Sequence, residues 1–427
     1  MPHTQDLNNT LTLILAGGQG ERLMPLTRDR AKPAVPFGGM YRIIDFTLTN
    51  CIHSGLRSIY VLTQYQARSL EEHIRFGWNF LPRRLGQFIS VRPPHHLQSG
   101  KWYQGTADAI YHNIDTLEKE RPERVLILSG DHIYKMDYGR MLIEHEENGA
   151  ALTIGAIPVR TSEASRFGVF EVDQDQRVVG FQEKPDEPKS MPDRPGWSLA
   201  SMGIYMFETS KLIEVLRADA EREGSSHDFG KDIIPRMIED SKVFAHNYVD
   251  VSNAAEPYWR DIGTLDSYYE ANIDLCRVEP KFNLYDSNWP IYTFTRYEPP
   301  AKTVFGDPAG KGLRAEVLDS LLCHGAVISG AKIKRSIISG QVRVEKRATV
   351  DSSILFTGVT VGADCRIRRA IIDKWVQIPD GTEIGYDLEL DAKRFKITPS
   401  GIVVVPHGYD FGRESAVASP LIEKAKS

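Results

Sequence analysis

Glycines and basic residues crowd the end of the first apolar run of the chain. The stretch LAGGQGERLMPLTRDRAKPAVPFGG (15–39) has three glycines within four positions, followed by Arg22, Arg28, Arg30 and Lys32. Backbone N–H groups at glycines can approach a polyphosphate closely, and cations such as these can neutralise its charge. The spacing fits neither the dinucleotide-binding fingerprint nor the P-loop motif. We interpret the stretch as a loop that grips a nucleoside triphosphate, with a simple tight turn as the alternative.

Short apolar runs alternate with amphipathic stretches up to about residue 280, and these indicate the elements that would hold the loop. Four runs predict buried strands: LTLILA (11–16), SIYVLT (58–63), RVLILSG (124–130) and ALTIGAIPV (151–159). Between them, ARSLEEHIRF and ADAIYHNIDTLEKE predict helices. This order predicts an α/β fold with a mainly parallel sheet and helices on both faces. Ligands of such folds bind beyond the carboxyl ends of the strands, where GGQG and GDHIYKMD both fall.

A different period begins after LYDSNWPIYTFTRYEPPAK (284–302), whose weak periodicity predicts a connection. Apolar residues then recur at steps of six, six and five, so the pattern repeats every seventeen residues, four times: Leu321, Val327, Ile333; Ile338, Val344, Val350; Leu355, Val361, Ile367; Ile372, Ile378, Ile384. Hexapeptide repeats of this kind predict a parallel β-helix, in which each triplet makes one triangular coil with its apolar side chains inside. A β-sandwich with accidental spacing is the alternative.

The bulk composition limits the classes of function. A chain of 427 residues with 41% hydrophobic and 26% charged residues predicts a globular protein of two or three domains. Its net charge of −5 gives no general attraction to nucleic acid or to an anionic membrane. Four widely spaced cysteines predict buried thiols in a reducing compartment. Because we find neither a secretory signal nor an apolar run long enough to cross a bilayer, we expect a cytoplasmic protein.

The glycine-rich stretch resembles the signature of sugar-nucleotide pyrophosphorylases. Further motifs are similar to the ADP-glucose pyrophosphorylase (glucose-1-phosphate adenylyltransferase) branch, bacterial glycogen-synthesis type: YRIIDFTLTNCIHSG, WYQGTADAIYHN, GDHIYKMDY, FGVF, EKP, LASMGIYMF, DFGKDIIP, YWRDIGT and DAKRF. The resemblance spans roughly residues 10 to 405. It implies a Rossmann-like nucleotidyltransferase domain joined to a C-terminal left-handed β-helix. It also implies synthesis of ADP-glucose, commonly by a tetramer under allosteric control.

Combining the resemblance with the two periods, we predict four parts. A nucleotidyltransferase catalytic domain covers 8–282 and a linker covers 283–315. A left-handed β-helix with hexapeptide-type repeats covers 316–406. The tail, 407–427, shows little periodicity, and we assign it no role.

The implied reaction converts ATP and glucose 1-phosphate into ADP-glucose and diphosphate. A phosphate monoester has its second pKa near ~6, so the attacking group is already largely a dianion at neutral pH and needs no general base. The resemblance implies that Mg²⁺ is bound by Asp131 and Asp261, and that Asp131, Arg22 and Lys32 are catalytic. The alternative for an aspartate at a strand end is a turn cap. His132 is more consistent with positioning than with proton transfer.

The resemblance also assigns substrate-binding residues. Those for glucose 1-phosphate are Tyr103, Gly168, Glu183, Lys184 and Ser201. Those for the nucleotide are Leu15, Ala16, Gly17, Gly18, Gly20, Arg22, Gly105 and Asp108. The alternatives are packing roles for most of these residues and a solvated turn for the EKP motif.

Regulation is where this sequence departs from the family pattern. Many relatives carry a lysine just before RAKPAV and another after FGG, both associated with phosphorylated activators, whereas this chain has Asp29 and Met40. Arg30 and Arg42 remain as candidate allosteric residues. We therefore expect a small-molecule effector that is singly phosphorylated or a carboxylate, rather than a bisphosphate.

Three rival functions stay open at this point. The first is thymidylyl or uridylyl transfer to a sugar phosphate, which YRIIDF and WYQGTADA disfavour. The second is a bifunctional enzyme whose β-helix is an acyltransferase, although His324 is the only histidine within the four coils. The third is an inactive regulatory subunit, which the intact Asp131, Lys184 and Asp261 disfavour.

Overall fold

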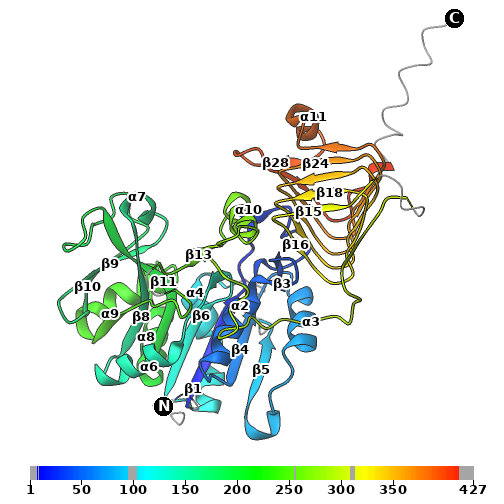
Figure 1. The fold of residues 1–427 in the computed structure, drawn as a ribbon. Coiled ribbons are helices and arrows are strands. Elements are labelled where there is room, and N and C mark those ends of the chain that lie inside the picture. Colours follow the sequence, from blue (N-terminus) through cyan, green and yellow to red (C-terminus); the bar gives the residue numbers. More distant parts are fainter. Residues whose placement is uncertain (1–6, 8, 95–102, 254–255, 308–312, 413–427) are drawn as a thin grey trace, which may run out of the picture. The chain divides into compact units, whose positions relative to one another are not determined.

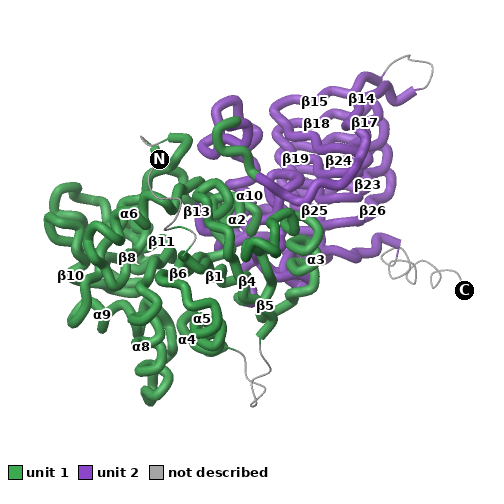
Figure 2. Tube along the Cα trace, turned by 90° about the horizontal axis from the view of Figure 1, so that it is seen from below, with its two compact units in different colours: residues 1–18, 44–259, 287–291 green, residues 19–43, 260–286, 292–427 purple. Residues whose placement is uncertain are grey.

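The computed structural model describes residues 7, 9–94, 103–253, 256–307 and 313–412. The chain forms two compact units, which differ in colour in Figure 2. The first unit contains the chain up to Gly18, together with 44–259 and 287–291. The second contains 19–43, 260–286 and 292–427. The short segment 19–43, which carries Arg22 and Lys32, therefore belongs to the same unit as the C-terminal repeats.

The first unit is built on a nine-stranded sheet whose centre is parallel (Figure 1). β1 (Thr10–Ala16) pairs in parallel with β4 (Ser58–Thr63) on one side and with β6 (Arg124–Ser129) on the other. β5 (Phe88–Arg92) continues the sheet beyond β4. β1, β4 and β6 are almost entirely buried, as expected for apolar runs covered on both faces, whereas β5 at the end of the sheet is mostly half-buried. The predicted strands at 11–16, 58–63 and 124–130 are confirmed.

The other half of this sheet is mixed. β11 (Trp197–Glu208) runs antiparallel to β6 and pairs with β8 (Leu152–Arg160) and β9 (Gly168–Val172), also antiparallel. β10 (Val178–Glu183) pairs with β9, and β12 (Val243–Asn247) lies in parallel beside β8. The β8 run was predicted, but its antiparallel neighbour was not, because apolar periodicity says nothing of strand direction.

Helices pack against the sheet and complete the core of this unit. The predicted helix ADAIYHNIDTLEKE is broken at His112–Asn113 into α4 (Thr106–Tyr111) and α5 (Ile114–Glu120). The predicted helix ARSLEEHIRF is confirmed as α3 (Arg68–Gly77). Other α-helices in the described part of this unit are α2 (Ile43–His53), α6 (Tyr138–Glu147), α7 (Thr161–Ala164), α8 (Thr209–Ala220) and α9 (Ile234–Asp240). Within the described ranges, no helix is both long and apolar enough to cross a membrane.

The second unit contains the predicted left-handed β-helix. Its strands stack in three parallel faces, with one antiparallel addition at β28. The first face is β14 (Lys302–Val304), β17 (Val327–Ser329), β20 (Arg343–Val344), β23 (Thr360–Val361) and β26 (Gln377–Ile378). The second is β15 (Glu316–Leu318), β18 (Lys332–Lys334), β21 (Thr349–Asp351), β24 (Arg366–Arg368) and β27 (Glu383–Ile384). The third is β16 (Leu321–Leu322), β19 (Ile337–Ile338), β22 (Ile354–Leu355), β25 (Ala370–Ile372), β29 (Val403–Val405) and β28 (Lys396–Ile397). A short helix, α11 (Leu388–Ala392), precedes β28.

The inward side chains follow the predicted repeat in all but the first coil. Ile338 lies in register with Leu322, not with Leu321, and Val344 lies in register with Ile328, not with Val327. Ile328 lies in the core of the β-helix and Leu322 packs against it, so the predicted places of Leu321 and Val327 inside the first coil are wrong. The first coil is one residue shorter than the later ones at one corner, and a one-residue shift in a strand turns the side chain to the other face.

α10 (Leu265–Asp274) belongs to the second unit and packs on the β-helix. It begins with a capping box in which Thr264 and Ser267 satisfy each other's backbone N–H groups. The ring of Tyr268 meets the ring of Phe356 edge-on, at a centroid distance of 6.4 Å. The segment predicted as a linker contributes β14 to the first face of the β-helix. The four-part division made from the sequence stays a prediction.

Candidate active site

The carboxyl ends of β1 and β6 form one edge of the first unit. Leu15 lies beside Ser129 in the parallel register, and its carbonyl accepts a hydrogen bond from the N–H of Gly130 at 3.0 Å. A Cβ on Gly17 would lie 2.9 Å from the side chain of Gln64, whereas a Cβ on Gly18 would meet nothing within 4 Å. The chain therefore leaves this edge as bare backbone beside open space, which is the surface that a polyphosphate needs.

Asp131 lies at the same edge, directly after Gly130. The hydroxyl of Ser129 donates to its carboxylate, and Nε2 of His132 lies 3.4 Å from it. The imidazole of His132 packs edge-on against the indole of Trp259, with centroids 5.1 Å apart. This packing fixes the imidazole, which supports a positioning role for His132.

Three of the predicted sugar-phosphate residues form a row across adjacent strands. The β9–β11 register pairs Ala200 with Val169, so Ser201 and Gly168 are the next residues along these two strands, and the β9–β10 register pairs Gly168 with Glu183. A Cβ on Gly168 would lie 2.9 Å from Oε2 of Glu183 and closer still to the ring of Phe181. Glycine is therefore required at Gly168 by close packing. The strand pairing brings together residues that are distant in sequence.

Lys184 follows this row in an unusual conformation. Its φ of 48° is left-handed, and its N–H donates to the carbonyl of Phe167 at 3.0 Å. Its ammonium group pairs with the carboxylate of Glu183, but its side chain is 61% exposed. An exposed pair of this kind contributes little to stability. A strained, exposed lysine beside a packed carboxylate is consistent with a ligand-binding role.

Tyr103, Gly105 and Asp108 lie at the start of α4. The ring of Tyr103 stacks on His112 with centroids 5.8 Å apart, and burial raises the pKa of its phenol. A Cβ on Gly105 would collide with the carbonyl of His227 at 2.2 Å. Asp108 accepts a hydrogen bond from the N–H of Gln104 at 2.9 Å. Gly105 and Asp108 thus shape this turn from within.

Asp228 is a residue that the sequence analysis did not single out. It caps the turn Phe229–Ile233 by accepting from the N–H of Gly230 at 2.9 Å, and it accepts from the hydroxyl of Thr106 at 3.0 Å. A Cβ on Gly230 would lie 2.5 Å from Oε2 of Glu183. Asp228 therefore links the first residue of α4 to the turn that packs beside Glu183 of the sugar-phosphate row. Asp228 is the first residue of the motif DFGKDIIP, and this motif is the feature of the sequence that could have identified it.

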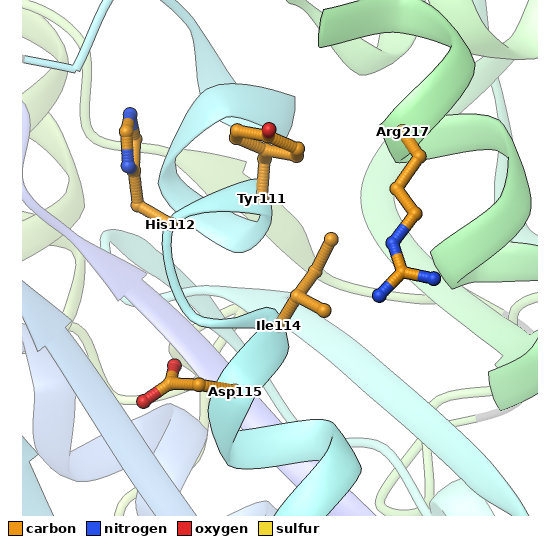
Figure 3. A pocket seen from close by; sticks show the side chains of 5 residues that line it. All are labelled: Tyr111, His112, Ile114, Asp115 and Arg217. Carbon is orange, nitrogen blue, oxygen red and sulfur yellow. The ribbon is translucent and has the colours of Figure 1, made fainter.

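A pocket of about 370 Å³ opens beside α4 and α5 and is shown in Figure 3. Five residues line it: Tyr111, His112, Ile114, Asp115 and Arg217. None of the predicted site residues is among this lining, and the guanidinium of Arg217 already pairs with Glu118 at 2.5 Å. We do not assign this pocket to the candidate active site.

The second unit contains the other predicted active-site residues. Gly20 has a left-handed φ of 65°, and its carbonyl accepts from the hydroxyl of Thr27 at 2.8 Å. The ammonium of Lys32 lies 3.0 Å from Oδ1 of Asp261. A Cβ on Gly263 would lie 3.4 Å from Nη2 of Arg22 and 3.0 Å from Oδ2 of Asp261. Arg22 and Lys32 therefore both approach Asp261.

A further group of cations surrounds Lys374 at the end of β25. Arg30 pairs with Asp373 at 2.9 Å. Burial, reinforced by the charges of Arg42, Arg30 and Arg296, lowers the pKa of Lys374 to about 7, although Asp373 opposes this. The predicted effector residues Arg30 and Arg42 therefore meet two cations from the C-terminal part of the chain. No sequence pattern signalled Arg296 or Lys374.

Two family models match the chain. The model described as "Nucleotidyl transferase" matches residues 11–278. The model described as "GlmU-like, C-terminal hexapeptide" matches residues 299–405. These matches agree with the two periods of the sequence, and both halves of the predicted fold class are confirmed.

Curated relatives match over nearly the full chain. "Glucose-1-phosphate adenylyltransferase" of Rhodopirellula baltica is 53% identical over 98% of this chain and 93% of the relative. "Glucose-1-phosphate adenylyltransferase 2" of Vibrio cholerae is 51% identical over 96% of this chain and 100% of the relative. The Koribacter versatilis protein of the first name is 52% identical over 94% of this chain and 96% of its own length. This chain therefore belongs to the glucose-1-phosphate adenylyltransferase family of nucleotidyl transferases.

Proposed function

We propose that this chain transfers the adenylyl group of ATP to glucose 1-phosphate, releasing diphosphate and giving ADP-glucose for glycogen synthesis. The structural observation that best supports this function is the row of Ser201, Gly168 and Glu183, with the exposed Lys184 beside it. This row offers hydrogen-bonding groups for a sugar and a cation for its phosphate. Identity near 50% to relatives with this name supports the assignment.

Positioning and charge neutralisation would carry the reaction. The phosphate of glucose 1-phosphate attacks the α-phosphorus in line, and as a dianion it gives up no proton to the protein. Lys184 would hold this phosphate. Arg22 and Lys32 would hold the triphosphate while its charge shifts to the leaving diphosphate. His132, with its ring fixed by Trp259, would orient Asp131.

Mg²⁺ is the cofactor that we propose, with Asp131 and Asp261 as its ligands. Mg²⁺ prefers carboxylate oxygens, usually one or two of them together with substrate phosphates. Each side chain fits this role, since Asp131 is 26% exposed and Asp261 is 29% exposed, so each carboxylate keeps access to a ligand. When bound, the ion would supply charge stabilisation for the phosphates.

The decisive assay is diphosphate release with glucose 1-phosphate and Mg²⁺, comparing ATP with UTP and dTTP. We expect ATP to be preferred by at least about 10²-fold in kcat/KM, as expected for a base recognised by hydrogen bonds. A preference for dTTP or UTP would select the first rival function. No turnover with any nucleotide would select the regulatory-subunit alternative.

We also infer that an anionic effector binds at Arg30, Arg42, Arg296 and Lys374. Burial first, and then the charges of Arg42, Arg30 and Arg296, lower the pKa of Lys374 to about 7, and an anion bound beside these cations would offset their mutual repulsion. Nη1 of Arg30 is buried and, among the described residues, has no hydrogen-bond partner. Dose–response curves with fructose 6-phosphate and with a small keto acid, on the parent and on Lys374→Met, test this assignment.

The assembly and the compartment are further proposals. We propose a homotetramer, on the basis of the family resemblance, and light scattering coupled to gel filtration tests it. We propose the cytoplasm as the compartment. All four cysteines are free thiols, and three of them are buried, namely Cys51, Cys276 and Cys365. Free buried thiols support a reducing environment.

A further inference from the structure

The β-helix holds the segment that carries the predicted nucleotide-binding cations. Nη2 of Arg30 donates to Oδ1 of Asp373 at 2.9 Å, and the two side chains are only 6% and 1% exposed. Asp373 follows β25, the strand of the third face that ends at Ile372. This ion pair therefore joins residues 343 positions apart in the chain and is screened from water.

Contacts from α10 hold the same segment a few residues further on. The hydroxyl of Tyr268 donates to the carbonyl of Pro36 at 2.6 Å, and its ring meets Phe37 edge-on at 6.3 Å. Oδ1 of Asn272 accepts from the N–H of Gly38 at 2.9 Å. The segment from Arg30 to Gly38 is thus fixed at its distal end by α10 and at its proximal end by Asp373.

Lys32 lies between these two anchors, two residues after Arg30. It begins a tight turn, Lys32–Ala34, in which the N–H of Val35 donates to the carbonyl of Lys32 at 3.1 Å. Its ammonium reaches Asp261 at 3.0 Å. Only Ala31 separates Arg30 from this turn, so a displacement of Arg30 would move the backbone of Lys32.

The segment from Arg30 to Gly38 is called the nucleotide-binding segment below. We propose that Asp373 is a positioning residue for this segment, acting through Arg30 on Lys32 and touching no substrate itself. The proposal rests on the function proposed above for Lys32. Replacing the carboxylate by the neutral amide of asparagine would leave the buried charge of Arg30 without a counter-charge, which is strongly unfavourable. The segment from Arg30 to Lys32 would then move to bring that charge to water. Misplacement by about 1 Å is enough to cost a catalytic group about 10²-fold in rate.

The experiment compares Asp373→Asn with a matched control, Asp391→Asn. Asp391 is also a buried aspartate of the second unit, and it pairs with Arg394 at 2.8 Å, but it lies in α11. Hydrogen exchange of the effector-free protein gives a readout independent of activity. We expect the amides of Ala34 and Val35 to exchange at least about tenfold faster in Asp373→Asn and at the parental rate in the control.

Kinetics without effector give the second readout. For Asp373→Asn we expect kcat/KM for ATP to fall by about 10- to 100-fold while the KM for glucose 1-phosphate stays within about twofold. Arg30→Ala should show the same pattern, and the double variant Arg30→Ala/Asp373→Asn should lose no more than either single variant.

The outcomes separate this proposal from the function on which it rests. Parental exchange at Ala34 and Val35 in Asp373→Asn would overturn the positioning role, whatever the activity. Equal losses for ATP and glucose 1-phosphate, or equal effects of Asp391→Asn, would also overturn it, because they indicate a general structural role. A parent without adenylyl transfer would refute the proposed function and leave the exchange test to decide the role of Asp373.

Discussion

The sugar-phosphate row of the first unit and the nucleotide-binding segment of the second are held by different kinds of contact. Ser201, Gly168 and Glu183 are neighbours because three strands pair in a fixed register. Lys32 is placed by a turn whose anchors, Asp373 and Tyr268, are side chains from distant parts of the chain.

The residues of the sugar-phosphate row are therefore harder to displace than Lys32. Moving a residue of the row requires a slip in register, which would turn every side chain of that strand to the other face. Moving Lys32 requires only the loss of a few side-chain contacts. We therefore expect substitutions in the row to act on chemistry and substrate binding alone, and substitutions around the segment to act also on regulation.

The largest expected effect is at the edge of the first unit. Asp131→Asn should lower turnover by on the order of 10³-fold or more, because charge stabilisation by the metal is worth several kcal/mol. The melting temperature should stay near that of the parent. Asp137→Asn is the matched control, since Asp137 caps α6 and asparagine caps a helix equally well. Activity of Asp131→Asn within about tenfold of the parent would contradict the role assigned to Asp131.

The next effect tests the sugar-phosphate row. Lys184→Ala should raise the KM for glucose 1-phosphate by about 10- to 150-fold, the equivalent of one charge-assisted hydrogen bond of about 1.5 to 3 kcal/mol. Lys189→Ala is the control, because Lys189 forms a similarly exposed pair with Glu171 at 2.7 Å outside the row. If the KM for ATP rose instead, Lys184 would belong to the nucleotide subsite.

The third prediction concerns pH and the second unit. An anion bound beside Lys374 favours its charged form, so binding takes up a proton whenever the pH exceeds the free pKa of about 7. Effector affinity should therefore fall by up to about tenfold per pH unit between pH 7.5 and 9. A phosphate effector is already a dianion throughout this range, so its own titration does not oppose the trend.

Isothermal titration of fructose 6-phosphate at constant ionic strength measures this dependence. Lys374→Met should bind more weakly and without the slope, since methionine does not titrate. A parent whose effector affinity is independent of pH between 7.5 and 9 would place the effector elsewhere.

The smallest effect concerns effector choice. Asp29 lies in an exposed pair with Arg28 at 3.3 Å, and Met40 is 41% exposed. Asp29→Lys together with Met40→Lys changes the local charge by +2 and +1, and each exposed contact contributes about 1 kcal/mol or less. We expect the parent to respond weakly to fructose 1,6-bisphosphate and the double variant to prefer it more. Strong bisphosphate activation of the parent, unchanged in the variant, would argue against an effector site in this segment.

The motifs predicted the fold class and the order of elements because they consist of local signals. The apolar runs predicted β1, β4 and β6 to within a residue, and the glycines marked where the chain leaves the sheet. The period of seventeen predicted the β-helix. Its first coil was wrong by one residue because Leu321 and Leu322 are both apolar, and only strand pairing decides which of them turns inward.

The sequence by itself determined that there are two architectures, that the family is that of adenylyltransferases, and which residue types are available for chemistry. The tertiary structure alone decided that the segment 19–43 belongs to the same unit as the β-helix, and that Arg30 forms a buried ion pair with Asp373. It also decided that Lys374 lies among Arg30, Arg42 and Arg296. The physical reason is that burial and charge pairing depend on distances between residues hundreds of positions apart, and neither propensity nor periodicity carries those distances.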